Sequence, residues 1–415
     1  MSSLEDPANA SPSPYNLEAS GGANQVRVRA YNERLVLSLV RRHGALSKAD
    51  IARRTGLSAQ TVSVIMRVLE KEGLLLRDEP VRGRVGQPST PMRLNADAVL
   101  SFGVKIGRRS ADLVLMDFVG TIRQQLHRTY AYPLPHEILD FVTCGIREIE
   151  SGMSDRERQS IAGVGIAAPF ELWSWAEEVG APDGAMDVWR GFDLQIEIGA
   201  RVPHPVYLQN DATSACGAEL VFGVGARYPD FVYMFIGSFI GGGIVLNSSI
   251  FVGRTGTAGA IGPLPVRNRN GDTRQLLKIA SIFVLENLLR EHGIDPHPLW
   301  YSADDWIDFG PPLEIWIQDT AQALAQAIVA AASIIDFSAA VIDGGFPEWV
   351  RRRVVEATIR AASELDLQGV VLPEIIEGAV GTQARAIGGA SLPIFARYLI
   401  DQNILFKEID HAEAH

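Results

Sequence analysis

Two adjacent polar residues, Asn210 and Asp211, stand directly before a stretch that is typical of a helix, Ala212 to Phe222. Amide and carboxylate oxygens accept hydrogen bonds from hydroxyl groups, which is the chemistry of sugar binding. Asn and Asp are also good helix N-caps, so the pair could simply start that helix. We expect both residues to cap the helix, and their oxygens are also able to bind a hydroxylated ligand.

A second set of polar residues has the spacing of a DNA-reading helix. A helix capped by Ser58 and running to about Glu72 would bury an apolar stripe and leave short polar side chains near its N-terminus. Such side chains reach base edges in the major groove, whereas nearby arginines hold phosphates. The predicted DNA contacts are Arg53, Arg54, Ser58, Gln60, Thr61, Ser63 and Arg67.

A glycine- and arginine-containing loop follows, Val81 to Pro88. Arg82 and Arg84 flank a glycine, and such a slender basic segment suits a narrow minor groove, whose negative potential attracts arginine. The alternative is a solvated linker with incidental charge. We predict contact of Arg82 and Arg84 with the groove or with phosphates.

The elements expected around these residues are those of a winged helix-turn-helix. A helix at Ala30 to Arg42 ends at Gly44, Ser47 caps a short second helix that ends at Gly56, and the Ser58 helix is the third. Leu74 to Arg77 and Met92 to Leu94 would pair as strands around the basic loop. This order predicts a DNA-binding domain, with a small helical protein-interaction module as the alternative.

Composition divides the 415 residues into three parts. Residues 1–24 have the Ser, Pro, Gly and Asn content of a disordered tail and no secretory signal pattern. Residues 25–95 carry a net charge of +8, and residues 96–415 carry −16. A small basic domain on a large acidic one suits a nucleic-acid reader attached to a domain of another function.

Two further features concern the compartment. No uninterrupted apolar stretch is long enough for a membrane span, so no membrane partner is expected. Cys144 and Cys216 are the only cysteines, which favours a reducing, cytoplasmic location.

Residues 96–415 have an α/β texture. A three-strand meander at 99–106, 111–117 and 120–124 precedes further short strands, at 161–167, 206–208, 231–236, 243–246, 340–342 and 370–372. Helices are expected between them at 212–222, 276–291, 321–335 and 348–364. The order predicts two α/β lobes with a cleft between them.

An ordered series of glycine-containing motifs extends along this part of the chain. The motifs are Phe102 to Gly107, Gly163 to Pro169, Asn210 to Ala212, Phe235 to Gly243, Ala258 to Gly262 and Ile342 to Gly345. With the helix-turn-helix, this series resembles the ROK family of repressors and sugar kinases. The resemblance implies an actin-like, ribonuclease-H-like fold of two lobes, a sugar between them, and a homodimer or homotetramer.

The phosphate loops differ from those of the family's kinases. The family's first loop resembles Asp-x-Gly-Gly-Thr, but Lys105 stands at the acid position here, and Arg108 and Arg109 replace the second glycine and the threonine. In the second loop Phe239 replaces a glycine that must approach phosphate. ATP-dependent catalysis needs an acid that holds the metal ion and loops that leave room for phosphate. The missing acid and the bulky side chains in both loops therefore argue against it. The basic cluster could hold another anion, although surface charge is the simpler interpretation.

The sugar edge and the zinc site of the family also differ. The family's Glu and His that reach the sugar appear here as Ala260 and Pro263, which suggests a ligand with fewer hydroxyls on one edge. The family's cysteine-rich zinc site corresponds to residues 268–281, where no cysteine occurs, so we expect no zinc and no other cofactor. The resemblance implies that Asn210 and Asp211 contact sugar hydroxyls. Asp211 matches the family's catalytic base but is predicted to bind rather than catalyse.

Aromatic residues cluster between Pro169 and Trp189. Trp173 and Trp175 follow a strand end that, by the resemblance, borders the sugar cleft, and aromatic faces stack on carbohydrate. Packing between the lobes is the alternative interpretation of these rings.

Together these features predict a DNA-binding regulator, a repressor, with double-stranded operator DNA as one partner and a sugar or sugar-like effector as the other. Catalytic, metal and cofactor residues are expected to be absent. One alternative is an ATP-dependent sugar kinase with an appended DNA-binding domain. Another is a regulator that has lost its small-molecule ligand and responds to a protein partner.

Overall fold

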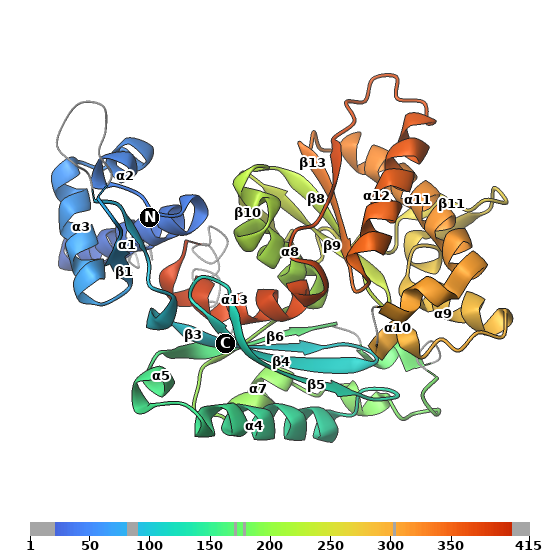
Figure 1. Cartoon of the computed structure of the whole chain (residues 1–415), viewed down its shortest axis with the longest axis horizontal. Helices are drawn as coiled ribbons and strands as arrows, with labels where there is room; N and C mark the ends of the chain where they lie inside the picture. Colours follow the sequence, from blue (N-terminus) through green and yellow to red (C-terminus); the bar gives the residue numbers. More distant parts are fainter. Residues whose placement is uncertain (1–20, 81–89, 170–171, 177–179, 302–303, 401–415) are drawn as a thin grey trace, which may run out of the picture.

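The computed structural model describes residues 21–80, 90–169, 172–176, 180–301 and 304–400. Its N-terminal domain is a winged helix-turn-helix at one end of the molecule (Figure 1). The capping groups expected from the sequence are present, because Ser47 Oγ accepts from Asp50 N and Ser58 Oγ accepts from Thr61 N. Its elements are α1 (Gly21–His43), α2 (Lys48–Thr55), α3 (Ala59–Lys71), β1 (Leu75–Arg77) and β2 (Met92–Leu94).

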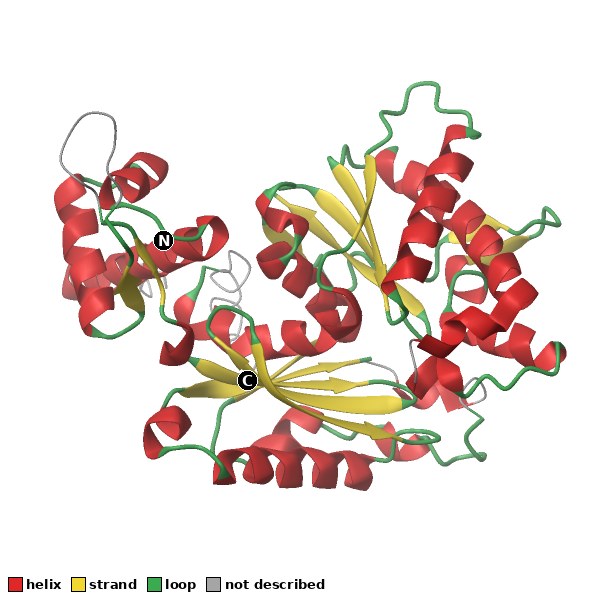
Figure 2. Ribbon diagram, viewed as in Figure 1, coloured by secondary structure: helices red, strands yellow, loops and turns green. Residues whose placement is uncertain are grey.

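The first lobe is built on a five-stranded sheet of order β5-β4-β3-β6-β7. The first three strands form the antiparallel meander, and β6 and β7 join β3 in parallel. Helices cover the outer face of the sheet (Figure 2). The elements are β3 (Leu100–Ile106), β4 (Ser110–Asp117), β5 (Ile122–Thr129), α4 (Pro135–Ser151), α5 (Asp155–Gln159), β6 (Ile161–Ala168), α7 (Leu194–Gly199) and β7 (Val206–Asn210).

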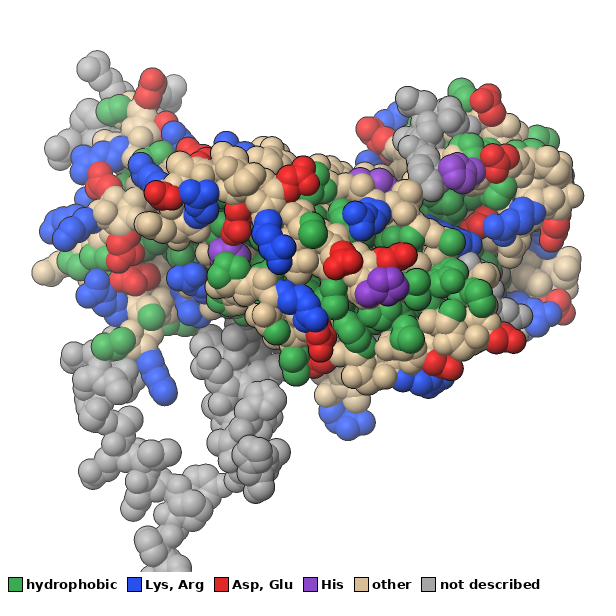
Figure 3. All heavy atoms as spheres, turned by 90° about the horizontal axis from the view of Figure 1, so that it is seen from below, with side chains coloured by type: hydrophobic (Ala, Val, Ile, Leu, Met, Phe, Trp, Pro, Cys, Tyr) green, Lys and Arg blue, Asp and Glu red, His purple; other side chains and the backbone are tan. Residues whose placement is uncertain are grey.

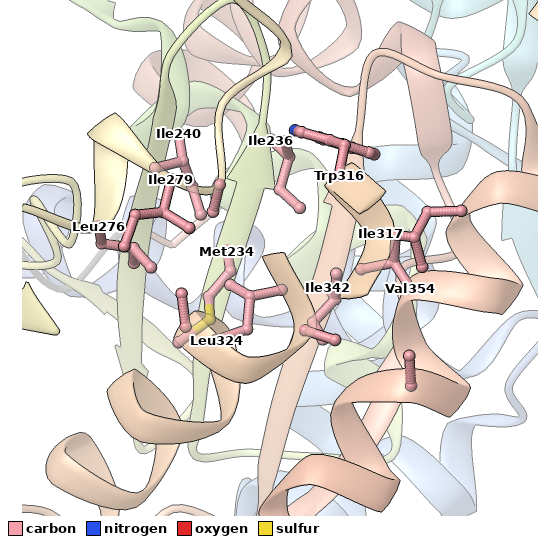
Figure 4. Close-up of a cluster of buried hydrophobic side chains, with 14 of the residues drawn as sticks. Met234, Ile236, Ile240, Leu276, Ile279, Trp316, Ile317, Leu324, Ile342 and Val354 are labelled. Carbon is pink, nitrogen blue, oxygen red and sulfur yellow. The ribbon is translucent and has the colours of Figure 1, made fainter. Parts of the chain in front are cut away.

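The second lobe repeats this topology, with a sheet of order β10-β9-β8-β13-β14 that is antiparallel on one side and parallel on the other. Figure 4 shows its core, where Met234, Ile342 and Leu324 from three elements face one another. The elements are β8 (Phe231–Ile236), β9 (Ile240–Leu246), β10 (Ser249–Phe251), β11 (Pro265–Arg267), β12 (Thr273–Gln275), α9 (Ile282–Glu291), α10 (Pro298–Tyr301), α11 (Gly310–Ala332), β13 (Ala339–Gly344), α12 (Glu348–Ser363) and β14 (Glu374–Glu377).

Two helices lie between the sheets, α8 (Asp211–Phe222) and α13 (Ala384–Tyr398). α13 packs on the first sheet and against α8, and α8 packs against the second sheet. The helices cross closely because α13 has glycine there: a Cβ on Gly388 would stand 1.9 Å from the carbonyl oxygen of Ser214. A third core joins the winged helix to the first lobe, since it includes Val36 and Val40 of α1 together with Met116 and Phe118.

Most predicted elements are confirmed, with several differences. α1 begins at Gly21, so the expectation of a disordered tail over residues 1–24 is wrong for residues 21–24, while residues 1–20 lie outside the described part of the chain. α11 begins at Gly310, well before the expected start at Ala321. The strand expected at 370–372 is wrong, because β14 begins at Glu374. The helix expected from Leu276 begins at Ile282, after a 3-10 turn at Leu276–Lys278. α4 and α13 were not anticipated; the glycines and the internal Pro393 of α13 are poor helix formers in sequence but fit a closely packed helix.

Candidate functional site: nucleic-acid interface and ligand cleft

The third helix of the N-terminal domain presents a polar face. Val62, Ile65, Met66 and Leu69 are buried as expected, whereas Gln60 and Arg67 are exposed and Thr61 and Ser63 are partly exposed. The exposed hydroxyl of Ser58 is shared with Thr61, at 2.8 Å between the two oxygens. The face therefore has the short polar groups at its N-terminal end that base reading requires.

Two arginines beside this face, Arg53 and Arg54, interact with exposed partners. Arg53 pairs with Asp50, and Arg54 Nη1 lies 3.2 Å from the ring of His43. Burial, followed by Arg54 and Arg42, lowers the pKa of His43, so its ring is neutral beside the arginine. Exposed ion pairs contribute little to stability, so Arg53 and Arg54 can exchange these partners for phosphates at low cost.

One residue of this face was missed from the sequence. Val64 is 48% exposed on α3, one helical turn after Gln60 and one before Arg67. An apolar side chain there can contact the methyl group of thymine. Because α3 already has four apolar residues at core positions, the exposed valine was a detectable signal. Arg82 and Arg84 lie outside the described residues, so their role stays a prediction.

Charge on the large domain is mixed. On the face shown in Figure 3, side chains of both signs are interspersed, with several Lys and Arg at the end formed by the winged helix.

A cavity of about 290 Å³ lies between the lobes. Asn210 and Asp211 form part of its wall, with Phe235 and Phe239 of the second lobe. The two polar residues are brought there because β7 ends at Asn210 and α8 begins at Asp211. The predicted pair is therefore at a strand end that opens into a cleft, a typical place for a ligand in an α/β protein.

The two members of the pair differ in their bonding. Asn210 Oδ1 caps α8, accepting from the N–H groups of Ala212 and Thr213 at 3.0 and 3.2 Å. Asp211 makes no such cap, contrary to the expectation that both would do so. Its Oδ2 instead accepts from Arg385 Nη1 at 3.4 Å. Asp211 is therefore a carboxylate in the cleft that is oriented by one arginine, which the sequence analysis did not identify.

Ala260 and Pro263 also line this cavity and make that part of its wall apolar. Trp173 is not in this cavity; it borders a neighbouring hollow of about 350 Å³ that shares Pro169 with it. Trp173 packs on the first-lobe core, and its ligand contact remains a prediction. Trp175 belongs to the same 3-10 turn, Leu172–Trp175, and its side chain lies outside the described residues.

A second cavity of about 310 Å³ lies beside residues 105–109 and 237–242, the two loops that by resemblance correspond to the phosphate loops of the family's kinases. The Arg108 guanidinium, from the first loop, stacks over the Phe239 ring of the second loop at 3.8 Å from its centroid. Arg108 borders both cavities, so this stacked pair crosses the space between the lobes at their junction. Both side chains occupy positions that the resemblance assigns to glycine in the kinases.

Lys105 in this region is buried, at 6% exposure, so the surface-charge interpretation is wrong for this residue. Its Nζ bonds Ser110 Oγ at 2.7 Å and Asp112 Oδ2 at 3.1 Å. Burial and then Arg385 lower its pKa to about 8, against the raising effect of Asp112. A cation at this position cannot hold a metal ion, because both are positive. Among the described residues, no three His, Cys, Asp or Glu side chains gather as metal ligands.

The cleft is linked to the winged helix through α8. Phe222, at the C-terminal end of α8, lies under the Arg41 guanidinium of α1, 4.2 Å from guanidinium to ring centroid. Arg41 also donates to the Phe118 carbonyl, and Arg42 donates to the Gly225 carbonyl at 3.3 Å. Burial lowers the pKa of Arg41 to about 9, which still leaves it a cation at neutral pH. The helix that begins in the cavity therefore ends at the DNA-binding domain.

A winged helix docked on a two-lobed domain with a cleft at its centre defines a DNA-binding protein built on a sugar-kinase type of fold. Among the helices of the described ranges, none has the length and apolar character needed to cross a membrane.

Comparison with known proteins agrees with this class. Residues 101–274 match the ROK family, and residues 29–75 match the winged helix-turn-helix DNA-binding family. The xylose repressor of Bacillus subtilis is 25% identical over 244 residues, which span 59% of this chain and 62% of that protein.

Solved structures show the same fold. A ROK family transcriptional regulator, a homologue of the Escherichia coli MLC protein, superposes with a TM-score of 0.63 at 19% identity, over 92% of this chain and 99% of that one. A ROK family glucokinase from Streptomyces griseus gives 0.55 at 22% identity, over 71% and 98%. The chain therefore has the two-lobed, actin-like fold of these proteins behind a winged helix-turn-helix, and residues 101–274 of it are similar to the ROK family.

Proposed function

We propose that this protein is a transcriptional repressor that binds operator DNA through α3 and responds to a sugar or sugar-like ligand in the cavity at Asn210 and Asp211. The observation that carries the proposal is the course of α8, from Asp211 in the cavity to Phe222 against Arg41 of the DNA-binding domain. The relatives named as repressors support the same function.

In the proposed mechanism the ligand changes the populations of two arrangements of the lobes. A ligand that bonds Asp211 on one lobe and the second lobe across the cavity favours the closed arrangement. Closure displaces α8, and α1 must follow because Arg41 and Arg42 hold it to the end of that helix. In a homodimer or homotetramer, such a movement changes the spacing of two α3 helices, which must match half-sites about one helical turn or more apart.

The domain is further proposed to bind without transferring phosphate. Lys105 stands where the kinase loops have an acid, and the stacked Arg108 and Phe239 fill the path between the cavities. The glucokinase fold and the retained Asp211 favour the alternative of an active sugar kinase. Incubation with ATP, magnesium and a panel of aldoses, ketoses and polyols decides between them, and phosphorylated product would establish the kinase.

The regulatory function is tested by selecting bound fragments from random and genomic DNA and then adding the same sugars. We expect one preferred sequence, bound more weakly when one of the sugars is present. Failure to prefer any sequence would refute the repressor. Preference without any sugar response would favour the remaining alternative, a regulator that answers to a protein partner.

A further inference from the structure

A short hairpin follows the apolar wall of the first cavity in the chain. Its strands are β11 and β12, in which Pro265 pairs with Gln275 and Arg267 with Thr273. Val266, the middle residue of β11, is 5% exposed and belongs to the second-lobe core. The hairpin overlaps residues 268–281, the stretch that by resemblance corresponds to the family's zinc site.

The side chains of this stretch do not fit a zinc ion. Zinc is bound by Cys and His, with Asp or Glu as further ligands, in a tetrahedral set. Residues 263–281 include neither Cys nor His, and their one carboxylate is that of Asp272. This carboxylate accepts from Asn268 Nδ2 at 3.4 Å and lies 3.9 Å from the Arg274 guanidinium. Since the donor set for zinc is missing, another interaction must fix this part of the chain.

Backbone and amide hydrogen bonds close the tip of the hairpin. Asn268 N donates to the Asp272 carbonyl at 2.9 Å, and Asn268 Oδ1 accepts from the N–H groups of Asn270 and Asp272 at 3.0 and 2.9 Å. Gly271 has a φ of 86°, a left-handed conformation that glycine adopts without strain. The tip therefore keeps its shape through the chain's own hydrogen bonds.

Gln326 of α11 fastens β11, which lies beside this helix (Figure 1). Its Oε1 accepts from Arg267 N and its Nε2 donates to Arg267 O, both at 2.9 Å. A residue of a neighbouring antiparallel strand exchanges the same pair of bonds, but here one side chain supplies both. Arg269 adds an ion pair to Asp319 of the same helix. α11 itself is anchored in the second-lobe core, for instance by Leu324.

The other end of the hairpin forms part of the cavity wall. Leu276 N donates to the Leu264 carbonyl at 2.8 Å, and Leu277 N donates to the Gly262 carbonyl at 2.9 Å, so the pairing continues beyond the two strands. Gly262 and Leu277 both line the cavity. A continuous set of hydrogen bonds therefore runs from Gln326 to the surface that a ligand in this cavity would contact.

We propose that Gln326 is a positioning residue for the candidate ligand cavity, which through the β11–β12 hairpin fixes the wall at residues 260–263 without a metal ion. A fixed apolar wall favours a ligand whose facing edge has few hydroxyls, because a hydroxyl there loses its bonds to water without gaining a partner. This inference deepens the proposed function and rests on it only for the effect on the sugar response, because the coupling of Gln326 to the wall needs neither sugar nor DNA.

Amide hydrogen exchange of the intact protein measures this coupling without any ligand. Gln326→Leu removes both bonds to Arg267 and nearly keeps the size of the side chain. We expect the amides of Leu276 and Leu277 to exchange about 10-fold faster or more, because two hydrogen bonds that hold the hairpin are lost. The amides of β13, in the core of the same lobe, should keep their protection.

Two further variants act as controls. Gln318→Leu makes the same replacement on the same helix, at an exposed glutamine whose Nε2 bonds Glu314 one turn away, and should leave exchange at Leu276 and Leu277 unchanged. Gln326→Glu keeps the acceptor for Arg267 N but loses the donor, so its effect should be smaller than that of Gln326→Leu. Thermal melts show which variants fold, and Gln326→Glu decides the question if Gln326→Leu does not.

Two exchange results would overturn the proposal. Faster exchange confined to Arg267 would mean that the wall does not depend on Gln326. An equal increase throughout the second lobe, β13 included, would mean a general loss of stability. Addition of EDTA to the unmodified protein should leave exchange at Leu277 unchanged, and a loss of protection there would contradict a metal-free wall.

Operator release by the panel of aldoses, ketoses and polyols tests the consequence for the ligand. In Gln326→Leu the sugar concentration that releases half of the DNA should rise about 5-fold or more relative to Gln318→Leu, while operator affinity without sugar stays the same. An unchanged concentration, or weaker operator binding without sugar, would refute the positioning role. If none of the sugars releases DNA from the unmodified protein, the proposed sugar regulation fails, and the exchange result still decides the role of Gln326.

Discussion

The contact between Arg41 and Phe222 gives the most demanding test of how the two domains are joined. Replacing Arg41 with Met keeps an unbranched apolar stem but removes the cation over the ring and the bond to the Phe118 carbonyl. A cation over an aromatic ring contributes about 0.5–2 kcal/mol, and a charged hydrogen bond about 1.5–3 kcal/mol. The two losses together predict that α1 undocks about 2–5 kcal/mol more easily.

Amide hydrogen exchange of α1 measures this opening free energy directly. A chain of several domains does not unfold in one step, so a global melt would not isolate the contact. Arg29→Met is the matched control, because Arg29 is on the same helix, is exposed and pairs only locally with Glu33. The control should change protection in α1 by less than about 0.5 kcal/mol.

A double-mutant cycle with Phe222→Leu isolates the ring contact itself. The two changes should be non-additive by about 0.5–2 kcal/mol, since either one alone already removes the stacking. Effects that add within about 0.3–0.5 kcal/mol would refute the docking argument. Operator binding should persist in both variants, while its response to ligand should weaken, because α8 would no longer move α1.

The remaining predictions concern the ligand and the DNA. Asp211→Asn should keep the fold, since Asn210 makes the helix cap, and should weaken the sugar response by about 10-fold or more because a charged hydrogen bond becomes neutral. Gel retardation of operator DNA with and without sugar measures this response. An unchanged response would exclude Asp211 from the ligand site. Gln60→Ala should weaken operator binding more than random-DNA binding, whereas Arg54→Ala should weaken both and make the affinity for DNA less dependent on salt concentration. Equal losses of affinity for operator and random DNA in Gln60→Ala would exclude base reading by this residue. Val64→Ala should lose about 1 kcal/mol only at sites with thymine opposite it, as a panel of base substitutions would show.

Local patterns predicted the winged helix well. Ser47 and Ser58 cap their helices as expected, and the strand Met92–Leu94 has the predicted bounds, because caps and apolar periodicity are short-range properties. Asn210 and Asp211 were also placed correctly at the cleft. Their different bonding was not predictable, since it depends on Arg385, 174 residues further along the chain.

The missed helix explains why Arg385 was missed. α13 reads poorly as a helix because it contains Gly388, Gly389 and Pro393, and those residues are there for contacts with other elements. Lys105 shows the same limit, because its charge suggested the surface while its neighbours bury it. Side-chain environments made by distant segments cannot be read from local periodicity.

The shared core of the winged helix and the first lobe bears on how such regulators can be recombined. Val36 and Val40 of α1 pack in one cluster with Met116 and Phe118, which belong to the β4 strand and the turn after it. A chimaera cut at the junction near Asn95 would separate the two halves of this cluster and expose both. A biosensor that exchanges the DNA-reading head should therefore carry the matching β4–β5 turn with it, or redesign the two apolar surfaces together.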